Sequence, residues 1–318
     1  MRLNIRYLTR FDYAEPVSES QNELRACPAT DQHQQLVHYD VTVSPSSRVA
    51  SYLDYWGTRV DTFGIRQRHD HLEVVAEATV DTLPADEIEP GVSLTDVRAT
   101  RFRDEHFPFL QPSPHADWGD AVTAAAQQTV AGCGDDAVAA VLAIHERAAD
   151  LDYEQGRTYV GVDVDRVFQA GAGVCQDFAH LAVAMYRAVG IPARYVSGYL
   201  FTIDDSSGED TAEDEVEVQT HAWVEVALPG RGWCAFDPTN RQTVSERHVT
   251  IGRGRDYEDV APLRGVFNGS TDHELLVRVT MRRLSHQPAM PTFGSGLRRP
   301  HRQPQPQPHP QHEQQQQQ

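Results

Sequence analysis

The chain contains no lysine, and all 28 of its basic residues are arginine. Against them stand 46 acidic residues, 27 Asp and 19 Glu, which give a net charge of -18. A surface this acidic repels the phosphate backbone, so we expect no nucleic-acid partner. An acidic surface without lysine also suits a cytoplasm of very high salt, because screening over about 3 Å at 1 M removes self-repulsion. High genomic GC content is the alternative explanation for the arginine bias.

Long apolar runs are missing as well. No stretch approaches the roughly 18 residues of a membrane-spanning helix, and the charged, alternating opening MRLNIRYLTRFDY lacks the apolar region of a signal peptide. No C-x-x-C pair occurs among Cys27, Cys133, Cys175 and Cys234, which argues against a zinc ribbon or a thioredoxin motif. We therefore expect a cytoplasmic protein with free thiols, no membrane partner and no cofactor.

Strictly alternating apolar residues dominate residues 1–82, as in Val37-Tyr39-Val41-Val43, and predict a small β-sandwich. Residues 83–114 hold five prolines, which disfavour long helices and central strands, so this segment is predicted to be a connector. A core with the helices and strands of an α+β fold is expected over 115–284. The Pro-, Gln- and His-rich residues 285–318 have the composition of a disordered tail.

Apolar residues at helical spacing and β-type runs predict the elements of this core. Helices are expected over 115–131, 135–151 and 164–170 and from Cys175 to Gly190, and strands over 194–203, 216–228, 233–237, 248–252 and 274–284. The acidic segment 204–215 reads as a solvated loop, because it lacks the ligand order of an EF-hand.

One stretch, Gly171 to Tyr199, organises the predicted core. Its glycine-rich turn delivers Cys175 to the first turn of a helix, where the dipole and unpaired N–H groups favour a thiolate and lower a cysteine pKa below about 8.5. A nucleophilic thiol needs a base, and the base needs an orienting group. His221 and Asp237 lie 16 residues apart in a predicted hairpin, so Asp237 can accept from one imidazole nitrogen while the other faces Cys175.

Three segments together resemble the transglutaminase-like superfamily of papain-like cysteine enzymes: Gly173-Val174-Cys175, His221-Ala222-Trp223 and Asp237-Pro238-Thr239. The N-terminal β-region and residues 259–266 also resemble the two-part bacterial and archaeal members. The resemblance implies helices packed on an antiparallel sheet. It also implies acyl transfer from a peptide or protein amide through a thioester, with Cys175 as nucleophile, His221 as base and Asp237 as its orienting group. The acceptor is water for a peptidase or amidase and a second amine for a transamidase.

Further residues are assigned supporting roles. The backbone N–H of Cys175 is the expected oxyanion donor, and Gln169, six residues upstream, is the candidate for a second donor. Asp177 is expected to cap the first helical turn, and Trp223 to pack the hairpin or support the site.

Two other functions stay open at this stage. One is a catalytically silent scaffold that binds peptides. The other is a metal site built on Cys175, His180, His221 and Cys234, which lacks typical ligand spacing. His180 is otherwise expected to point away from the thiol. The sequence does not indicate the oligomeric state.

Overall fold

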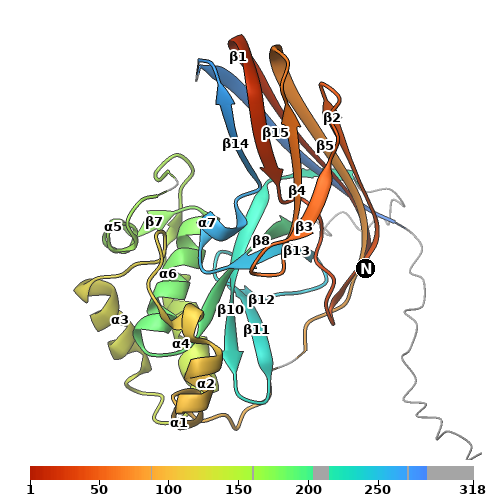
Figure 1. Cartoon of the computed structure of the whole chain (residues 1–318). Coiled ribbons are helices and arrows are strands. Elements are labelled where there is room, and N and C mark those ends of the chain that lie inside the picture. The colour runs from red at the N-terminus through yellow and green to blue at the C-terminus, as the bar shows by residue number, and fades with distance from the viewer. Residues whose placement is uncertain (87, 160, 203–214, 271, 285–318) are drawn as a thin grey trace, which may run out of the picture. The chain divides into compact units, whose positions relative to one another are not determined.

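A computed structural model describes residues 1–86, 88–159, 161–202, 215–270 and 272–284 (Figure 1). Its longest strand, β1 (Arg2–Leu24), joins two halves of an eight-stranded antiparallel sheet. The register of β1 against β5 shifts between Asp12 and Val17, a segment that contains Pro16, which has no N–H to donate to a neighbouring strand. The predicted β-sandwich thus takes the form of a single sheet that curls around its own core. Its other strands are β2 (Gln34–Ser44), β3 (Ala50–Leu53), β4 (Arg59–Ile65), β5 (His69–Thr82), β9 (Glu215–Val218), β14 (Leu263–Asn268) and β15 (His273–Arg283).

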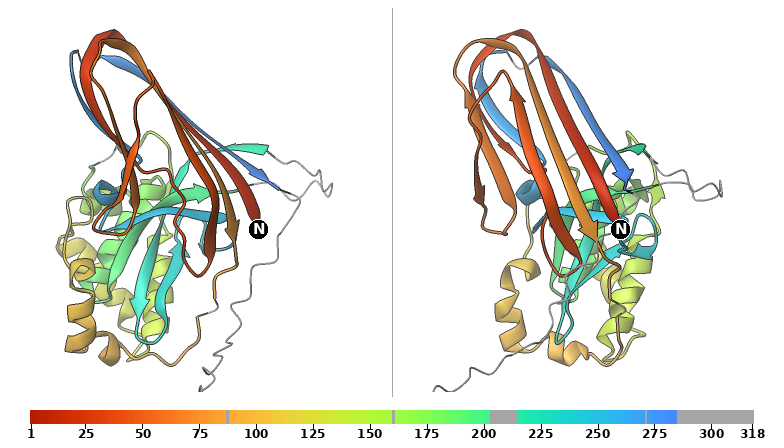
Figure 2. Two further views of the ribbon diagram at one scale, coloured as in Figure 1. Left: turned by 45° about the vertical axis from the view of Figure 1, so that its right-hand side comes forward. Right: turned by 90° about the vertical axis from the view of Figure 1, so that its right-hand side faces the viewer.

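Strands from the C-terminal part of the chain complete this N-terminal sheet. β15 pairs with the first half of β1 and β14 with its second half, and Figure 2 shows β1 and β15 side by side. From the sequence, residues 115–284 were all expected in the core, and of these two strands only the one over 274–284 was predicted. Alternation predicts a strand but not its partner. The single strand predicted over 216–228 is wrong: β9 belongs to the N-terminal sheet, whereas β10 (Thr220–Leu228) belongs to the core sheet. The chain changes sheets at Gln219.

The core contains a second antiparallel sheet with the strand order β12-β11-β10-β8-β13. Its strands are β8 (Ala193–Leu200), β10, β11 (Gly232–Asp237), β12 (Gln242–Thr243) and β13 (His248–Gly254). In β10 the side chains of Ala222, Val224 and Val226 pack with the helices in one apolar core. The intervening residues, among them Trp223 and Glu225, lie on the opposite face. Helices thus cover one face of the core sheet, which confirms the α+β class (Figure 1).

The central helix, α6 (Cys175–Ala188), is buried along most of its length. Its Phe178, Leu181 and Met185 are at most 2% exposed, and each such side chain contributes about 1.5–3 kcal/mol by leaving water. Around α6 pack α3 (Asp120–Val130), α4 (Ala137–Ala148) and α5 (Val164–Ala170). The predicted connector 83–114 carries short helical segments: α1 (Leu94–Val97), α2 (Thr100–Glu105) and the 3₁₀ turn η1 (Phe107–Leu110).

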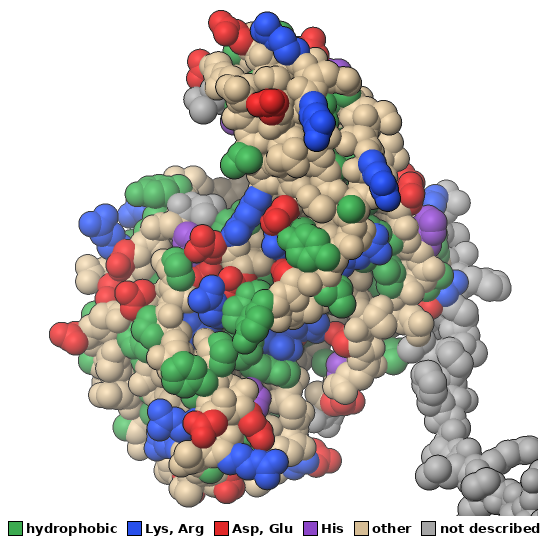
Figure 3. Space-filling model, in the orientation of Figure 1, with side chains coloured by type: hydrophobic (Ala, Val, Ile, Leu, Met, Phe, Trp, Pro, Cys, Tyr) green, Lys and Arg blue, Asp and Glu red, His purple; other side chains and the backbone are tan. Residues whose placement is uncertain are grey.

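Acidic and basic side chains are interspersed on the face shown in Figure 3, rather than gathered into one patch. Exposed ion pairs of the molecule include Arg101–Glu105 and Arg278–Glu217, and such pairs stabilise a fold by only about 0–1 kcal/mol. No helix among the described residues is long and apolar enough to cross a membrane. The predicted tail and residues 204–214 of the predicted acidic loop lie outside the described residues, and the last residue of that loop, Glu215, begins β9.

Candidate active site

Cys175 is the first residue of α6, and the backbone before it sets its position. Gly171 ends α5 with φ of 67°, a left-handed conformation that favours glycine, and so turns the chain into β7 (Ala172–Gly173). β7 pairs with β6 (Asp152–Tyr153), and the Glu154 N–H donates to the Gly173 carbonyl at 2.9 Å. The Cys175 N–H lies in the first turn of α6, where N–H groups have no partner within a helix.

A cleft of about 220 Å³ contains both Cys175 and His221. The Cys175 Sγ atom lies 4.0 Å from the carbonyl oxygen of Thr220, where β10 begins. Thus the start of α6 and the start of β10 meet at this cleft. Thr220, the first residue of β10, follows Gln219, where the chain passes from one sheet to the other. The other lining residues are Tyr153, Gln155, Val174, Gln176, Tyr195, Ser197, Gln219, Thr220, Ala222, Tyr257 and Pro262.

His221 connects the thiol to a buried carboxylate. Its Nε2 atom is 2.8 Å from Oδ2 of Asp237, and Cys175 is also a hydrogen-bond partner of the His221 side chain. Because Nε2 is occupied, Nδ1 is the nitrogen available to the thiol. Burial alone would lower the pKa of His221, but the hydrogen bonds with Asp237 and Cys175 outweigh it and raise this pKa to about 9. His221 is therefore held as an imidazolium at neutral pH.

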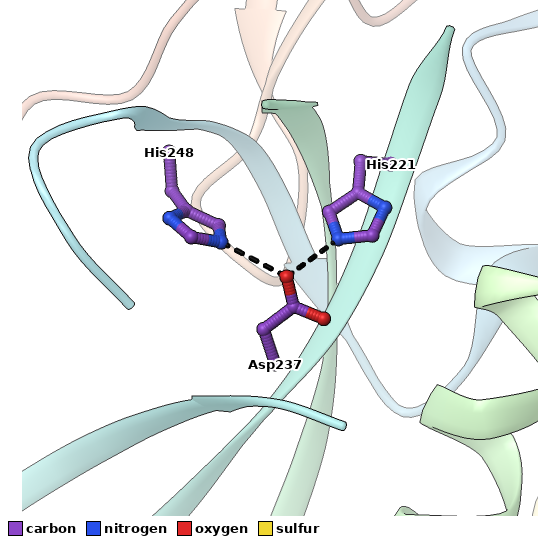
Figure 4. Close-up of side chains that lie close together, drawn as sticks. All are labelled: His221, Asp237 and His248. Carbon is purple, nitrogen blue, oxygen red and sulfur yellow. Dashed lines mark hydrogen bonds and ion pairs between the residues drawn. The ribbon is translucent and has the colours of Figure 1, made fainter. Parts of the chain in front are cut away.

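Asp237 is completely buried and accepts several hydrogen bonds. Besides His221, the Oδ2 atom is 3.1 Å from His248 Nε2 and 2.6 Å from Asn240 Nδ2, and the Asn240 backbone N–H donates to Oδ1 at 3.2 Å. Burial alone would raise the pKa of Asp237, but hydrogen bonds from His221, His248 and Asn240 hold it far below its usual value. Figure 4 shows the two histidines on either side of this carboxylate.

Sequence reasoning missed the contact of His248 with Asp237. The strand that begins at His248 was predicted, but no motif or spacing connects this residue to Asp237. His248 begins β13, which pairs with β8 and not with the hairpin that carries His221 and Asp237. Without an expected sheet order, the sequence holds no local signal that identifies it.

Asp177 and Trp223 lie beside the site. The Asp177 carboxylate accepts the backbone N–H of Val174 at 2.8 Å and the hydroxyl of Thr158 at 2.5 Å, so it caps the turn that carries Cys175. Trp223 is fully buried, and its ring centroid lies 6.0 Å from that of His221 and 5.3 Å from that of His248. It therefore packs against both imidazoles from the sheet face opposite α6.

Gln169 does not reach the site. It is exposed on α5, and the described residues that line the cleft include Gln155, Gln176 and Gln219 instead. The oxyanion role predicted for Gln169 is therefore wrong, because its side chain is exposed on α5 and does not line the cleft.

The proposed metal site is not formed by the part of the chain that the structure describes. His180 is buried, its ring stacks on Tyr195 at 4.7 Å, and its Nε2 accepts the Tyr257 N–H at 3.2 Å. Cys234 packs against the helical core. The close groups of potential ligands among the described residues are His221, Asp237 and His248, and His115, Asp256 and Glu258. Neither group contains His180 or Cys234.

A larger cavity of about 940 Å³ lies on the sheet face opposite α6. Trp223 and His248 are among the residues around this cavity, whereas His221 and Asp237 are not. Its wall also holds the buried Glu225, which accepts hydrogen bonds from Arg194 and Arg253.

Comparison with known proteins agrees with this architecture. Residues 123–238 match the model of the transglutaminase-like superfamily, and residues 3–81 match that of the bacterial transglutaminase-like N-terminal region. An uncharacterized protein of Mycobacterium leprae is 36% identical over 285 residues, which cover 88% of this chain and 98% of that protein. An uncharacterized protein of Mycobacterium tuberculosis is 31% identical, covering 86% of this chain and 90% of the relative.

A solved structure shares the fold. It belongs to a protein of Cytophaga hutchinsonii proposed to be a cysteine protease, with a TM-score of 0.67 and 22% identity over 89% of this chain and 98% of that chain. The two matched regions and the full-length likeness to the mycobacterial proteins together place both parts of the molecule in one family. The chain belongs to the transglutaminase-like superfamily, in the bacterial form that carries its own N-terminal region.

Proposed function

We propose that this protein is a cysteine enzyme that transfers the acyl group of a peptide or protein amide through a thioester on Cys175. The observation that carries the proposal is the position of His221, which contacts both Cys175 and the buried carboxylate of Asp237. A histidine held as an imidazolium beside a thiol favours a thiolate, which is the nucleophilic form of cysteine.

In the first half of the reaction, the Cys175 thiolate attacks the amide carbon. The carbon–nitrogen bond then breaks as His221 gives its Nδ1 proton to the leaving ammonia or amine, which leaves a thioester. In the second half, water or another amine gives a proton to His221 and attacks the thioester, and the carbon–sulfur bond breaks to release the Cys175 thiolate beside the restored imidazolium. The Cys175 N–H in the first turn of α6 stabilises the oxyanion, and loss of such a donor costs about 10²–10³ in rate.

The composition of the cleft supports an uncharged substrate group. Apart from His221, the described residues that line it carry amide, hydroxyl, thiol or apolar side chains, and none is Asp, Glu or Arg. A carboxamide or a peptide bond suits such a lining, because neither brings a charge that would have to be desolvated without a partner. A protein-glutamine gamma-glutamyltransferase of Pseudomonas aeruginosa supports the glutamine side chain as one substrate, since it is 38% identical over 79 residues, 25% of this chain and 11% of that protein.

Mass spectrometry of glutamine-containing peptides tests the proposal. The peptides are incubated with wild type or Cys175→Ala, with and without a small primary amine, because cleaved, deamidated and amine-tagged products differ in mass. We expect products with wild type only, and the product found identifies water or the amine as acceptor. Identical spectra for wild type and Cys175→Ala with every class of peptide would contradict the proposal, and peptide binding without turnover would favour the silent scaffold.

A further inference from the structure

His248 contacts Asp237 from the side opposite His221. Its side chain is fully buried, and its Nε2 atom lies 3.1 Å from the same Oδ2 atom that His221 contacts at 2.8 Å (Figure 4). It comes from β13, which lies at the edge of the core sheet beyond β8. Asp237 therefore bridges two imidazole rings, of which only the His221 ring lies at the cleft with Cys175.

The other nitrogen of His248 fixes its tautomer. The backbone N–H of Ser245 points at Nδ1 at 3.1 Å, and a backbone N–H can only donate. Nδ1 must therefore accept with its lone pair, which places the ring proton on Nε2 and directs it at Asp237. His248 is thus a neutral donor, whereas His221 is the ring whose proton Asp237 holds in place.

We propose that His248 is a positioning residue for the reaction. It donates from Nε2 to Oδ2 of Asp237, which keeps that oxygen aimed at His221 and keeps the carboxylate charged. The inference rests on the proposed function, because it assigns His248 to the same catalytic group.

Two features of the surroundings explain why the contact between His248 and Asp237 matters. A buried carboxylate is costly unless donors satisfy it, and the Asn240 donor approaches from an exposed residue that water can replace. His248 instead approaches from the interior. Its ring also packs edge-on against Trp223, with ring centroids 5.3 Å apart, and so fills the interior beside Asp237. Loss of the ring would open space into which the Asp237 carboxylate can turn, away from His221.

Two substitutions of His248 distinguish the effect of its Nε2 donor from that of the rest of the side chain. In His248→Gln the amide nitrogen falls near the position of Nε2, so the donor to Asp237 is kept. In His248→Asn the amide falls near Nδ1, so the contact with the Ser245 N–H is kept and the donor to Asp237 is lost. His69→Asn, at a buried histidine of β5, serves as the matched control for placing asparagine at a buried histidine.

We expect kcat of His248→Asn to fall by about 10–100-fold, the usual effect of losing a group that orients a ligand or catalytic side chain, with KM little changed. His248→Gln should stay within about threefold of wild type, and His69→Asn should leave kcat unchanged. Equal kcat for wild type and His248→Asn, or equal losses in the Asn and Gln variants, would overturn the positioning role.

The alkylation rate of Cys175 by iodoacetamide separates this inference from the proposed function. If wild type forms no Cys175-dependent product, the proposed function fails, but the alkylation rate still reports on the Cys175–His221–Asp237 group. A slower rate in His248→Asn than in wild type and His248→Gln supports positioning in that case as well. Identical rates in the three proteins overturn it.

Discussion

Two buried carboxylates lie on the same face of the core sheet, and their partners differ. Glu225 on β10 pairs with Ala235, two residues before Asp237 on β11, and both acids are at most 4% exposed. Glu225 Oε2 accepts from Arg194 Nε at 2.6 Å, and Arg253 Nε lies 3.0 Å from Oε1. Asp237 instead receives two histidines. Burial would raise the pKa of each acid, and in each case its partners reverse the shift.

The difference distinguishes an ion group that holds structural elements together, at Glu225, from a carboxylate that pairs with titratable side chains, at Asp237. Arginine stays charged at any pH at which the protein is folded, so Glu225 meets fixed charges and holds elements together. Arg253 also pairs with Asp31 at 2.6 Å and so ties the N-terminal region to the core sheet. Histidine gains and loses a proton near neutral pH, so a carboxylate beside it controls a group that can take part in catalysis.

The largest expected effect comes from Asp237→Asn. The amide keeps the shape of the side chain but carries no charge and favours the wrong tautomer of His221, a change that typically lowers kcat by about 10⁴-fold. Steady-state kinetics on the substrate identified by mass spectrometry, with the melting temperature as a control for folding, measures the effect. A kcat within tenfold of wild type would show that Asp237 does not orient the base.

Glu225→Gln should lower the stability of the fold rather than kcat. Removing the carboxylate of this buried ion group takes from Arg194 its partner Glu225 and leaves Arg253 with Asp31 alone, which is expected to lower the free energy of unfolding by about 3–5 kcal/mol. The kcat of the folded fraction should stay close to that of wild type, because Glu225 lies outside the cleft. The control is Glu217→Gln, whose exposed partner is Arg278, with an expected cost below about 1 kcal/mol in denaturant titration. A catalytic loss as large as that of Asp237→Asn would erase the distinction between the two acids.

The pH dependence of kcat/KM reports on His221, a histidine partner of Asp237. Since the pKa of His221 is raised to about 9, kcat/KM should fall above pH 9 as the imidazolium loses its proton. The raised pKa of His221 also stabilises the fold. The contribution of His221 to the free energy of unfolding is complete below pH 6.5, the ordinary pKa of histidine, and is lost as the pH rises through 9. Glu225→Gln should keep the upper limit of activity. A basic limb centred near 6.5 in wild type would contradict the assigned role of His221.

The smallest effect is expected for Asn240→Ala. Asn240 donates to Asp237 at 2.6 Å from an exposed position, so water can replace part of the lost contact. We expect a loss in kcat/KM of about fivefold, which corresponds to roughly 1 kcal/mol for one hydrogen bond. A loss equal to that of His248→Asn would mean that the exposed and the buried donor contribute alike.

The sequence predicted the parts of the site that local signals encode. The glycine turn and helix start at Cys175 and the hairpin with His221 and Asp237 are readable, because each follows from neighbouring residues. His248 and the division of residues 215–228 between two sheets are not readable, because they depend on which strands become neighbours. The prediction for Gln169 was wrong because α5 ends between Gln169 and Cys175, so closeness in sequence does not bring the two side chains together. The cytoplasmic location and the adaptation to high salt stay predictions.

Alkylation of Cys175 at pH 7 tests the central claim most directly. Iodoacetamide is applied to wild type and to Asp237→Asn, and the rate at each thiol is followed by peptide mass spectrometry. Burial raises the pKa of Cys27 to about 11, so this thiol supplies an unreactive reference within the same chain. The account predicts that Cys175 reacts far faster than Cys27 and Cys133 in wild type, and that the excess largely disappears in Asp237→Asn. A Cys175 no more reactive than Cys133 in wild type would contradict it.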